Sequence, residues 1–220
     1  MKLLIFTALT LATFFASTFL ILNSLEIVTV NDIKNVLHYI SEVSPWSLSF
    51  IVVAFLFADL FIAIPTLTVS IIAGYFLGFA YGFFSVTAGL LIAGYSGYFI
   101  SRKVGPRLLH RIAEKRKVDE MQQLFQRHGL FMLLICRATP ILPEVTACLS
   151  GLSGMSLSIF TIGWSLNSLT YAAIATYAGS VSTIENPMPA IYTAIGVSGV
   201  SGLGWYFFIG RQRKSEEGLM

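Results

Sequence analysis

The chain has 220 residues, of which 55% are hydrophobic and only 11% are charged, with a net charge of +3. Soluble domains typically carry about 25% charged residues, whereas residues 3–25, 60–101, 145–184 and 186–210 contain none. Because a bilayer-spanning helix needs about 20 apolar residues, the composition excludes a soluble domain. It predicts an all-α membrane protein that crosses the bilayer several times.

The basic residues form two short patches beside apolar runs. Residues 102–127 hold eight positive and three negative side chains, and residues 211–214 read RQRK. By the positive-inside rule both patches are expected in the cytoplasm, so the charge indicates membrane topology and no nucleic-acid partner. Neither the three histidines nor the two cysteines form a metal-ligand pattern, and we expect no metal site and no cofactor.

The first apolar run, residues 3–22, is expected to be a retained transmembrane anchor within residues 1–24. A cleaved signal peptide is the alternative, but its apolar core is about 7–15 residues long, shorter than this run. Residues 31–44 have apolar positions at helical spacing, which predicts an amphipathic helix along the outer membrane interface. Trp46 is expected to anchor that interface.

The first half of the membrane domain, residues 46–101, begins with a broken segment. Residues 46–64 are apolar apart from Asp59 and end at Pro65, and a new apolar segment follows at once. We predict that 46–64 and 65–80 form a re-entrant hairpin entered from outside, followed by a full span at about 83–101. The basic loop 102–128, with a short amphipathic helix inside it, closes this half.

The second half, residues 129–180, repeats this arrangement. Residues 129–139 are too short to span the bilayer and are stopped by Pro140 and Pro143. With a second short segment up to residue 154 they predict a hairpin entered from inside, followed by a span at 157–179.

A last span at 188–209 and a cytoplasmic tail, 211–220, complete the predicted topology. With the anchor there are four full crossings, which place both termini in the cytoplasm. The two hairpins enter from opposite faces, as in an inverted-repeat transporter. Residues 25–210 form the membrane domain in this prediction.

Three ionisable residues interrupt the apolar segments: Asp59, Arg137 and Glu144. One charge at a helix centre costs about 2.5–3.5 kcal/mol on insertion scales, and all three lie near the proline breaks. The half-helices after Pro65 and Pro143 present N–H groups that attract an anion, and the planar guanidinium of Arg137 suits phosphate. Asp59 and Glu144 could be proton-linked partners; the alternative is an arginine–carboxylate pair that only holds the hairpins together.

Glycines follow each break at short intervals. Gly74, Gly78 and Gly82 are spaced by four residues, which predicts one helix face that another helix approaches closely. Gly151 and Gly154 are expected to pack in the same way. The string GLSG at 151–154 is similar to that of intramembrane serine proteases, but no histidine follows residue 128 to act as a base. We therefore expect no enzymatic activity.

The stretches IPTLTVSIIAGYFLGFAYGFFSVTAG (64–89) and FMLLICRATPILPEVTACLSGLSGMSLSIF (131–160) resemble the two halves of the DedA/SNARE-associated Golgi protein family, also called the VTT domain. The resemblance covers about residues 45–180, and its most specific element is R-x-x-P-x-x-P at Arg137, Pro140 and Pro143. It implies two opposed re-entrant hairpins and a group that includes lipid scramblases and polyprenyl-phosphate translocases. The essential arginine of the family maps onto Arg137.

The chain departs from the family pattern in the first hairpin. Members of the DedA branch usually carry an acidic residue just after the first hairpin proline, where this chain has Thr66, Thr68 and Ser70. Proton coupling through this hairpin would then require Asp59 to take that place. The expected substrate-binding residues are Arg137, Pro140, Pro143, Glu144, Asp59, Pro65, Thr66 and Thr68.

The leading functional hypothesis is a transporter in the bacterial cytoplasmic membrane that flips an anionic phospholipid or polyprenyl phosphate. Its partners would be membrane lipids and protons, and the sequence leaves a homo-oligomer open. One alternative is a proton- or ion-coupled small-solute transporter that uses the same cavity. Another is a non-transporting membrane scaffold or assembly factor.

Overall fold

The computed structural model describes two main stretches, residues 44–112 without Ala63 and residues 142–183. It also describes Thr13, parts of 122–136 and parts of 188–199. The predicted anchor 3–22, the amphipathic helix 31–44 apart from its last residue, most of the last span and the tail 211–220 lie outside the described residues. Every described element is a helix or a turn, in agreement with the all-α prediction.

Helix α3, Pro45–Ala58, begins with proline in its first turn, and the hydroxyl of Ser44 accepts a hydrogen bond from Trp46 N. Its 14 residues correspond to about 21 Å, less than the ~30 Å hydrocarbon core of a bilayer. The helix ends six residues earlier than the predicted segment 46–64. Residues 59–62 instead form a turn in which Phe61 N and Ile62 N donate to the carbonyl of Ala58.

Helix α4, Thr66–Ile112, starts directly after Pro65 and is broken at Gly78, which has φ 72° and ψ 175°. The two parts fold against each other, since a Cβ built on Gly82 would lie 3.1 Å from the Cα of Gly74. The break comes two residues before the predicted hairpin end at 80. Beyond it the helix continues to Ile112 and extends into the predicted basic loop.

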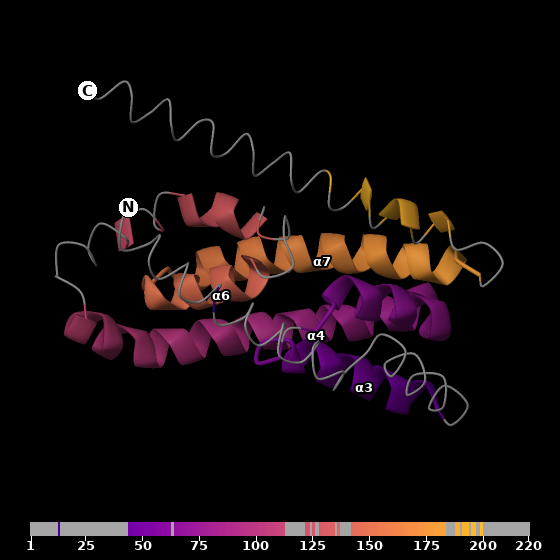
Figure 1. Cartoon of the computed structure of the whole chain (residues 1–220), viewed down its shortest axis with the longest axis horizontal. Helices are drawn as coiled ribbons and strands as arrows, with labels where there is room; N and C mark the ends of the chain where they lie inside the picture. Colours follow the sequence, from indigo (N-terminus) through magenta and orange to yellow (C-terminus); the bar gives the residue numbers. More distant parts are fainter. Residues whose placement is uncertain are drawn as a thin grey trace, which may run out of the picture.

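In the second half, α6, Leu142–Leu152, is joined to α7, Leu157–Val181, by a tight turn. Gly154 in that turn has φ 70°, and the hydroxyl of Ser156 accepts a hydrogen bond from Ile159 N at the start of α7. Helix α4 packs against α3, α6 and α7, and Figure 1 shows α7 running alongside α4 for much of its length. The long helices of the two halves, α4 and α7, thus pack side by side.

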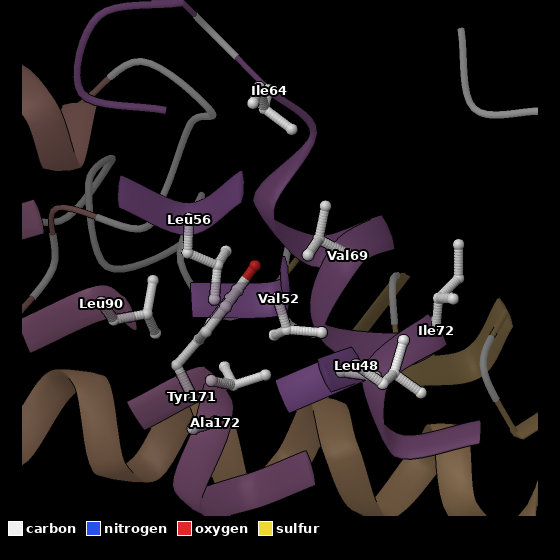
Figure 2. Close-up of a cluster of buried hydrophobic side chains, with 11 residues drawn as sticks. Leu48, Val52, Leu56, Ile64, Val69, Ile72, Leu90, Tyr171 and Ala172 are labelled. Carbon is white, nitrogen blue, oxygen red and sulfur yellow. The ribbon is translucent and has the colours of Figure 1, made fainter. Parts of the chain in front are cut away.

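The core of the described residues consists of two clusters of buried apolar side chains, each of which includes residues of α4 and α7. One cluster, shown in Figure 2, joins α3 and both parts of α4 to α7, where the ring of Tyr171 rises toward Leu56 and Val52. The second cluster joins α4, α6 and α7 around Tyr98, Phe160 and Trp164. Each hairpin is therefore packed against long helices by buried apolar side chains.

The outer faces of the helices carry many exposed aromatic and aliphatic side chains. Trp46 is 77% exposed, and its ring meets that of Tyr81 edge to face at 6.3 Å. In water such apolar patches would promote association, whereas lipid tails would cover them. Within the described part of the chain, one helical stretch, Thr66–Gly105, which contains the break at Gly78, is by length and composition apolar enough to cross a membrane. The re-entrant paths and the four crossings stay predictions.

Candidate functional site

Asp59 closes the first hairpin break with both oxygens of its carboxylate. Oδ1 accepts a hydrogen bond from Ile64 N at 2.7 Å, and Oδ2 accepts one from the hydroxyl of Thr66 at 2.7 Å. The residue is only 6% exposed. The carboxylate thus lies beside the first turn of α4, where the positive end of the helix dipole favours negative charge.

This geometry bears on the missing acidic residue after the first hairpin proline. Thr66 directly follows Pro65, and its hydroxyl contacts the carboxylate of Asp59. Asp59 thus places a carboxylate next to the residue that follows Pro65, while its role in place of an acidic residue there stays a prediction. Thr68, two residues further on, is half-buried and does not line the pocket described next.

A small pocket joins the two hairpin breaks. Its volume is about 20 Å³, enough for one water molecule. It contains Asp59 from the first break and Glu144 from the second, together with Pro143. Its remaining lining residues come from α3, the turn after it, α4, α6 and α7: Leu56, Leu60, Leu90, Ala93, Gly94, Ala147 and Trp164.

The structure thus brings three of the predicted binding residues together, while their role stays a prediction. Arg137 and Pro140 lie outside the described residues. Pro65 is half-buried beside the first break. Among the described residues no group of histidine, cysteine and acidic side chains could hold a metal ion.

Trp164 forms one wall of this pocket and was not predicted from the sequence. Its Nε1 donates a hydrogen bond to the carbonyl of Leu90 at 3.0 Å. The indole lies so close to Gly94 that a Cβ there would overlap the ring. Trp164 stacks on Phe160, and Phe160 stacks on Tyr98 at 4.5 Å. The stack fixes the ring, and the signal in the sequence was a tryptophan inside a charge-free run.

The second hairpin is tied to the long helices by polar side chains. Asn167 of α7 donates to the carbonyl of Leu133, near the end of the short helical segment 128–134, and to Cys136 Sγ at 3.1 Å. Such donors satisfy carbonyl groups that a broken helix leaves without an intrahelical partner. Asn167 therefore ties the described residues Leu133 and Cys136 to α7.

A second polar contact holds the turn between α6 and α7. Tyr98 and Arg102, both on α4, donate to the carbonyl of Met155. The guanidinium of Arg102 also donates to the hydroxyl of Tyr98. This contact fixes the turn against α4 near the start of the basic patch.

The glycines divide into two kinds. Gly74 lies against the backbone of Thr176 on α7, and Gly151 lies against the backbone of Tyr98 on α4, so close that a Cβ at either position would overlap a carbonyl oxygen. Gly82 likewise packs against the first part of α4. These three bear out close helix packing.

Gly78 and Gly154 differ from that prediction. Both have positive φ. Gly78 lies at the kink within α4 and Gly154 lies in the turn between α6 and α7, and a Cβ on Gly78 would meet nothing within 4 Å. The expectation that Gly74, Gly78 and Gly82 share one face of a continuous helix was therefore wrong, because the helix is broken at Gly78. These two positions need glycine for its backbone conformation and not for close packing.

Packed apolar helices that enclose two carboxyl side chains and expose many apolar side chains are typical of an α-helical membrane protein. The family model of the VTT domain matches residues 64–181. That range is more than half of the chain, so the chain belongs to the VTT-domain family. It includes both hairpin breaks from Ile64 onward and ends at the last residue of α7.

The chain is also similar to an uncharacterized membrane protein of Mycobacterium leprae (strain TN). It is 29% identical over 80 residues, which cover 34% of this chain and 36% of the relative. The chain thus matches about a third of that protein. No solved structure matches the chain.

Proposed function

We propose that this protein moves an anionic lipid, a phospholipid or a polyprenyl phosphate, from one leaflet of the bilayer to the other. The headgroup would pass through the pocket between the two halves while the acyl or prenyl chains stay in lipid. One observation carries the proposal: Asp59 and Glu144 come from separate hairpin breaks and line the same pocket inside the helix packing. Ionisable side chains in such a place indicate a substrate or ion pathway.

The cation of this site would be Arg137, and its place in the sequence supports that role. Asp59 lies six residues before Pro65, and Arg137 lies six residues before Pro143. The carboxylate of Asp59 accepts a hydrogen bond from Thr66, which is the residue after Pro65. By the same spacing, the guanidinium of Arg137 would reach Glu144, which is the residue after Pro143. A phosphate group could then replace a carboxylate as the partner of the guanidinium.

The charges in this arrangement would link lipid binding to protons. Arg137 supplies one positive charge, while Asp59 and Glu144 can supply two negative charges. Because uncompensated charge is costly away from water, a site with all three is neutral only when one carboxyl group holds a proton. Replacing the second carboxylate by a phosphate monoanion would require the uptake of another proton. We therefore expect lipid movement to depend on the pH gradient.

The pocket volume of about 20 Å³ holds a water molecule and is too small for a headgroup. In this proposal the structure is the closed state, and the hairpins must move apart to admit lipid. The inner half-helices of the two hairpins are the first part of α4 and helix α6. Gly78 joins the first part of α4 to its long second part, and Gly154 lies in the turn that joins α6 to α7. Changes of backbone angle at these two residues would let the hairpins move while α4 and α7 keep their packing.

The test is lipid flipping by purified protein in liposomes, followed with fluorescent anionic lipid analogues and a membrane-impermeant quencher. The Arg137→Ala variant should lose flipping. The matched control is Lys103→Ala, which removes an exposed cation at the cytoplasmic end of α4 and should flip lipid normally. Unchanged flipping by the Arg137 variant would remove the mechanism.

The second candidate, a proton- or ion-coupled transporter of a small solute, is favoured by the size and acidity of the pocket. Two carboxyl groups around about 20 Å³ suit a proton or a small cation better than a headgroup. Proteoliposomes distinguish the two functions. Pumping or dissipation of a pH gradient that needs Asp59 and Glu144, without any lipid movement, would support the second candidate.

A further inference from the structure

Two buried hydroxyl groups between α4 and α7 lack the partner that their neighbours have. Thr87 is 8% exposed and Ser168 is 1% exposed, and neither hydroxyl has a hydrogen-bond partner among the described residues. By contrast, Thr176 donates to the carbonyl of Ala172 one turn earlier at 2.6 Å. Buried polar groups without a partner are rare and costly, so this pair needs a physical explanation.

The two hydroxyl groups lie at the same level of the α4–α7 interface. Tyr95 bonds to Thr161 at 3.0 Å, and the rings of Phe79 and Tyr177 meet at 6.1 Å. Between these antiparallel contacts, the residue midway along α4 is Thr87. The residue midway along α7 is 169, next to Ser168. Counted between these two contacts, Thr87 and Ser168 both fall near the middle of the α4–α7 interface.

This level is one helical turn from the pocket. Leu90 follows Thr87 by three residues, and Trp164 precedes Ser168 by four, and both Leu90 and Trp164 line the pocket with Asp59. Residues three and four apart are neighbours on a helix surface. The two hydroxyls therefore extend the polar part of the pocket along α4 and α7, away from the cytoplasmic end at Arg102.

We propose that Thr87 and Ser168 together hold a buried water molecule between α4 and α7. One water can bond to both hydroxyls at once, and helix carbonyls on either side have a second lone pair to offer. A buried water typically makes about three such bonds, which would satisfy groups that otherwise have no partner. If the proposed function is correct, this water also gives protons a route between the carboxyl groups and the outer side of the membrane.

The test is a double-mutant cycle on the full-length protein, read by thermal unfolding in detergent or nanodiscs. Thr87→Val and Ser168→Ala each remove one hydroxyl with little change of shape. Each should lower Tm by about 2–4 °C, because the water loses a partner. The double variant should lose less than the sum, since the water is already released by either change. Thr176→Val and Ser150→Ala, whose hydroxyls bond within their own helices, are the controls.

An unchanged or higher Tm in both single variants would show a dry interface and overturn the proposal, as would strictly additive losses. Radiolytic labelling gives a second measurement, because activated bound water oxidises the side chains around it. Oxidation of Leu90 and Trp164 should fall in the double variant and stay normal in the controls. A protein that moves no lipid but shows this pattern keeps the water site and loses only the proposed function.

Discussion

The carboxylate of Asp59 has a structural role and a charge-carrying role in the proposed mechanism, and different substitutions can separate the two. It holds the first hairpin break closed through Ile64 N and Thr66, and it carries the charge that would exchange a proton. Asparagine keeps an oxygen for Ile64 N and presents an amide group to the Thr66 hydroxyl, which can accept as well as donate. Alanine removes both contacts.

The expected loss of stability follows from these contacts. In Asp59→Ala the buried N–H of Ile64 loses its partner, which costs about 1–3 kcal/mol, and the Thr66 bond contributes about 0.5–1.5 kcal/mol more. At about 2–4 °C per kcal/mol for a chain of this size, Tm should fall by roughly 3–18 °C. Asp59→Asn should stay within about 4 °C of the wild type but should lose pH-dependent lipid flipping.

The assays are thermal unfolding and liposome flipping, measured on the same preparations of the two variants. Equal stability of Asp59→Asn and Asp59→Ala would refute the hydrogen-bond reasoning. Normal, pH-dependent flipping by Asp59→Asn would refute the role of the charge. If Asp59, Arg137 and Glu144 can be exchanged together for Asn, Gln and Gln without loss of function, the protein is the scaffold or assembly factor considered above.

Two further changes test the break and the pocket wall. Gly78→Ala places a side chain at φ 72° and ψ 175°, a region almost restricted to glycine, and should cost about 1–3 kcal/mol in chemical unfolding; Gly196→Ala, where a Cβ meets nothing within 4 Å, should not. Trp164→Phe keeps an aromatic ring but removes the bond to Leu90. It should lower stability by about 1 kcal/mol and slow flipping, and normal stability would show that this bond does not fix the ring.

Local sequence signals predicted the breaks well where proline marks them. Pro65 and Pro143 lie at the starts of α4 and α6, where proline fits the first helical turn. The helix predicted at 157–179 is α7, Leu157–Val181, because no charge or proline interrupts it, while its crossing of the membrane stays a prediction. Asp59 and Glu144 were singled out as charges in apolar runs, and both line the pocket.

Features that depend on the sign of a φ angle, or on contacts between residues far apart in the sequence, could not be predicted from local sequence signals. Gly-x3-Gly spacing has the same appearance whether a glycine packs against a helix or takes a positive φ, so the hairpin end was predicted at 80 but Gly78 was not recognised as the residue where the helix breaks. The early end of α3 comes from the turn that Asp59 closes with Ile64 and Thr66. Trp164 meets Leu90 across 74 residues of sequence, and nothing local marks that contact.

The two close-packed glycines show how the halves of the protein depend on each other. Gly74, in the inner half-helix of the first hairpin, lies on the backbone of α7, which belongs to the second half. Gly151, in the inner half-helix of the second hairpin, lies on the backbone of α4. Each precedes a positive-φ glycine, by four and three residues respectively. Each hairpin is thus seated on the long helix of the other half.

Because each hairpin packs against the long helix of the other half, we expect Gly74→Ala and Gly151→Ala to have similar effects on stability and lipid flipping. In both, the new Cβ meets backbone that cannot rotate away, and overpacking of this kind costs about 1–3 kcal/mol, or roughly 2–12 °C in Tm. Lipid flipping should fall in both variants, because a displaced hairpin no longer aligns its break with the shared pocket. If one substitution is harmless in both assays, that hairpin is not held by the opposite half. The two hairpins would then move independently, and a single pocket could not serve as the site of exchange between leaflets.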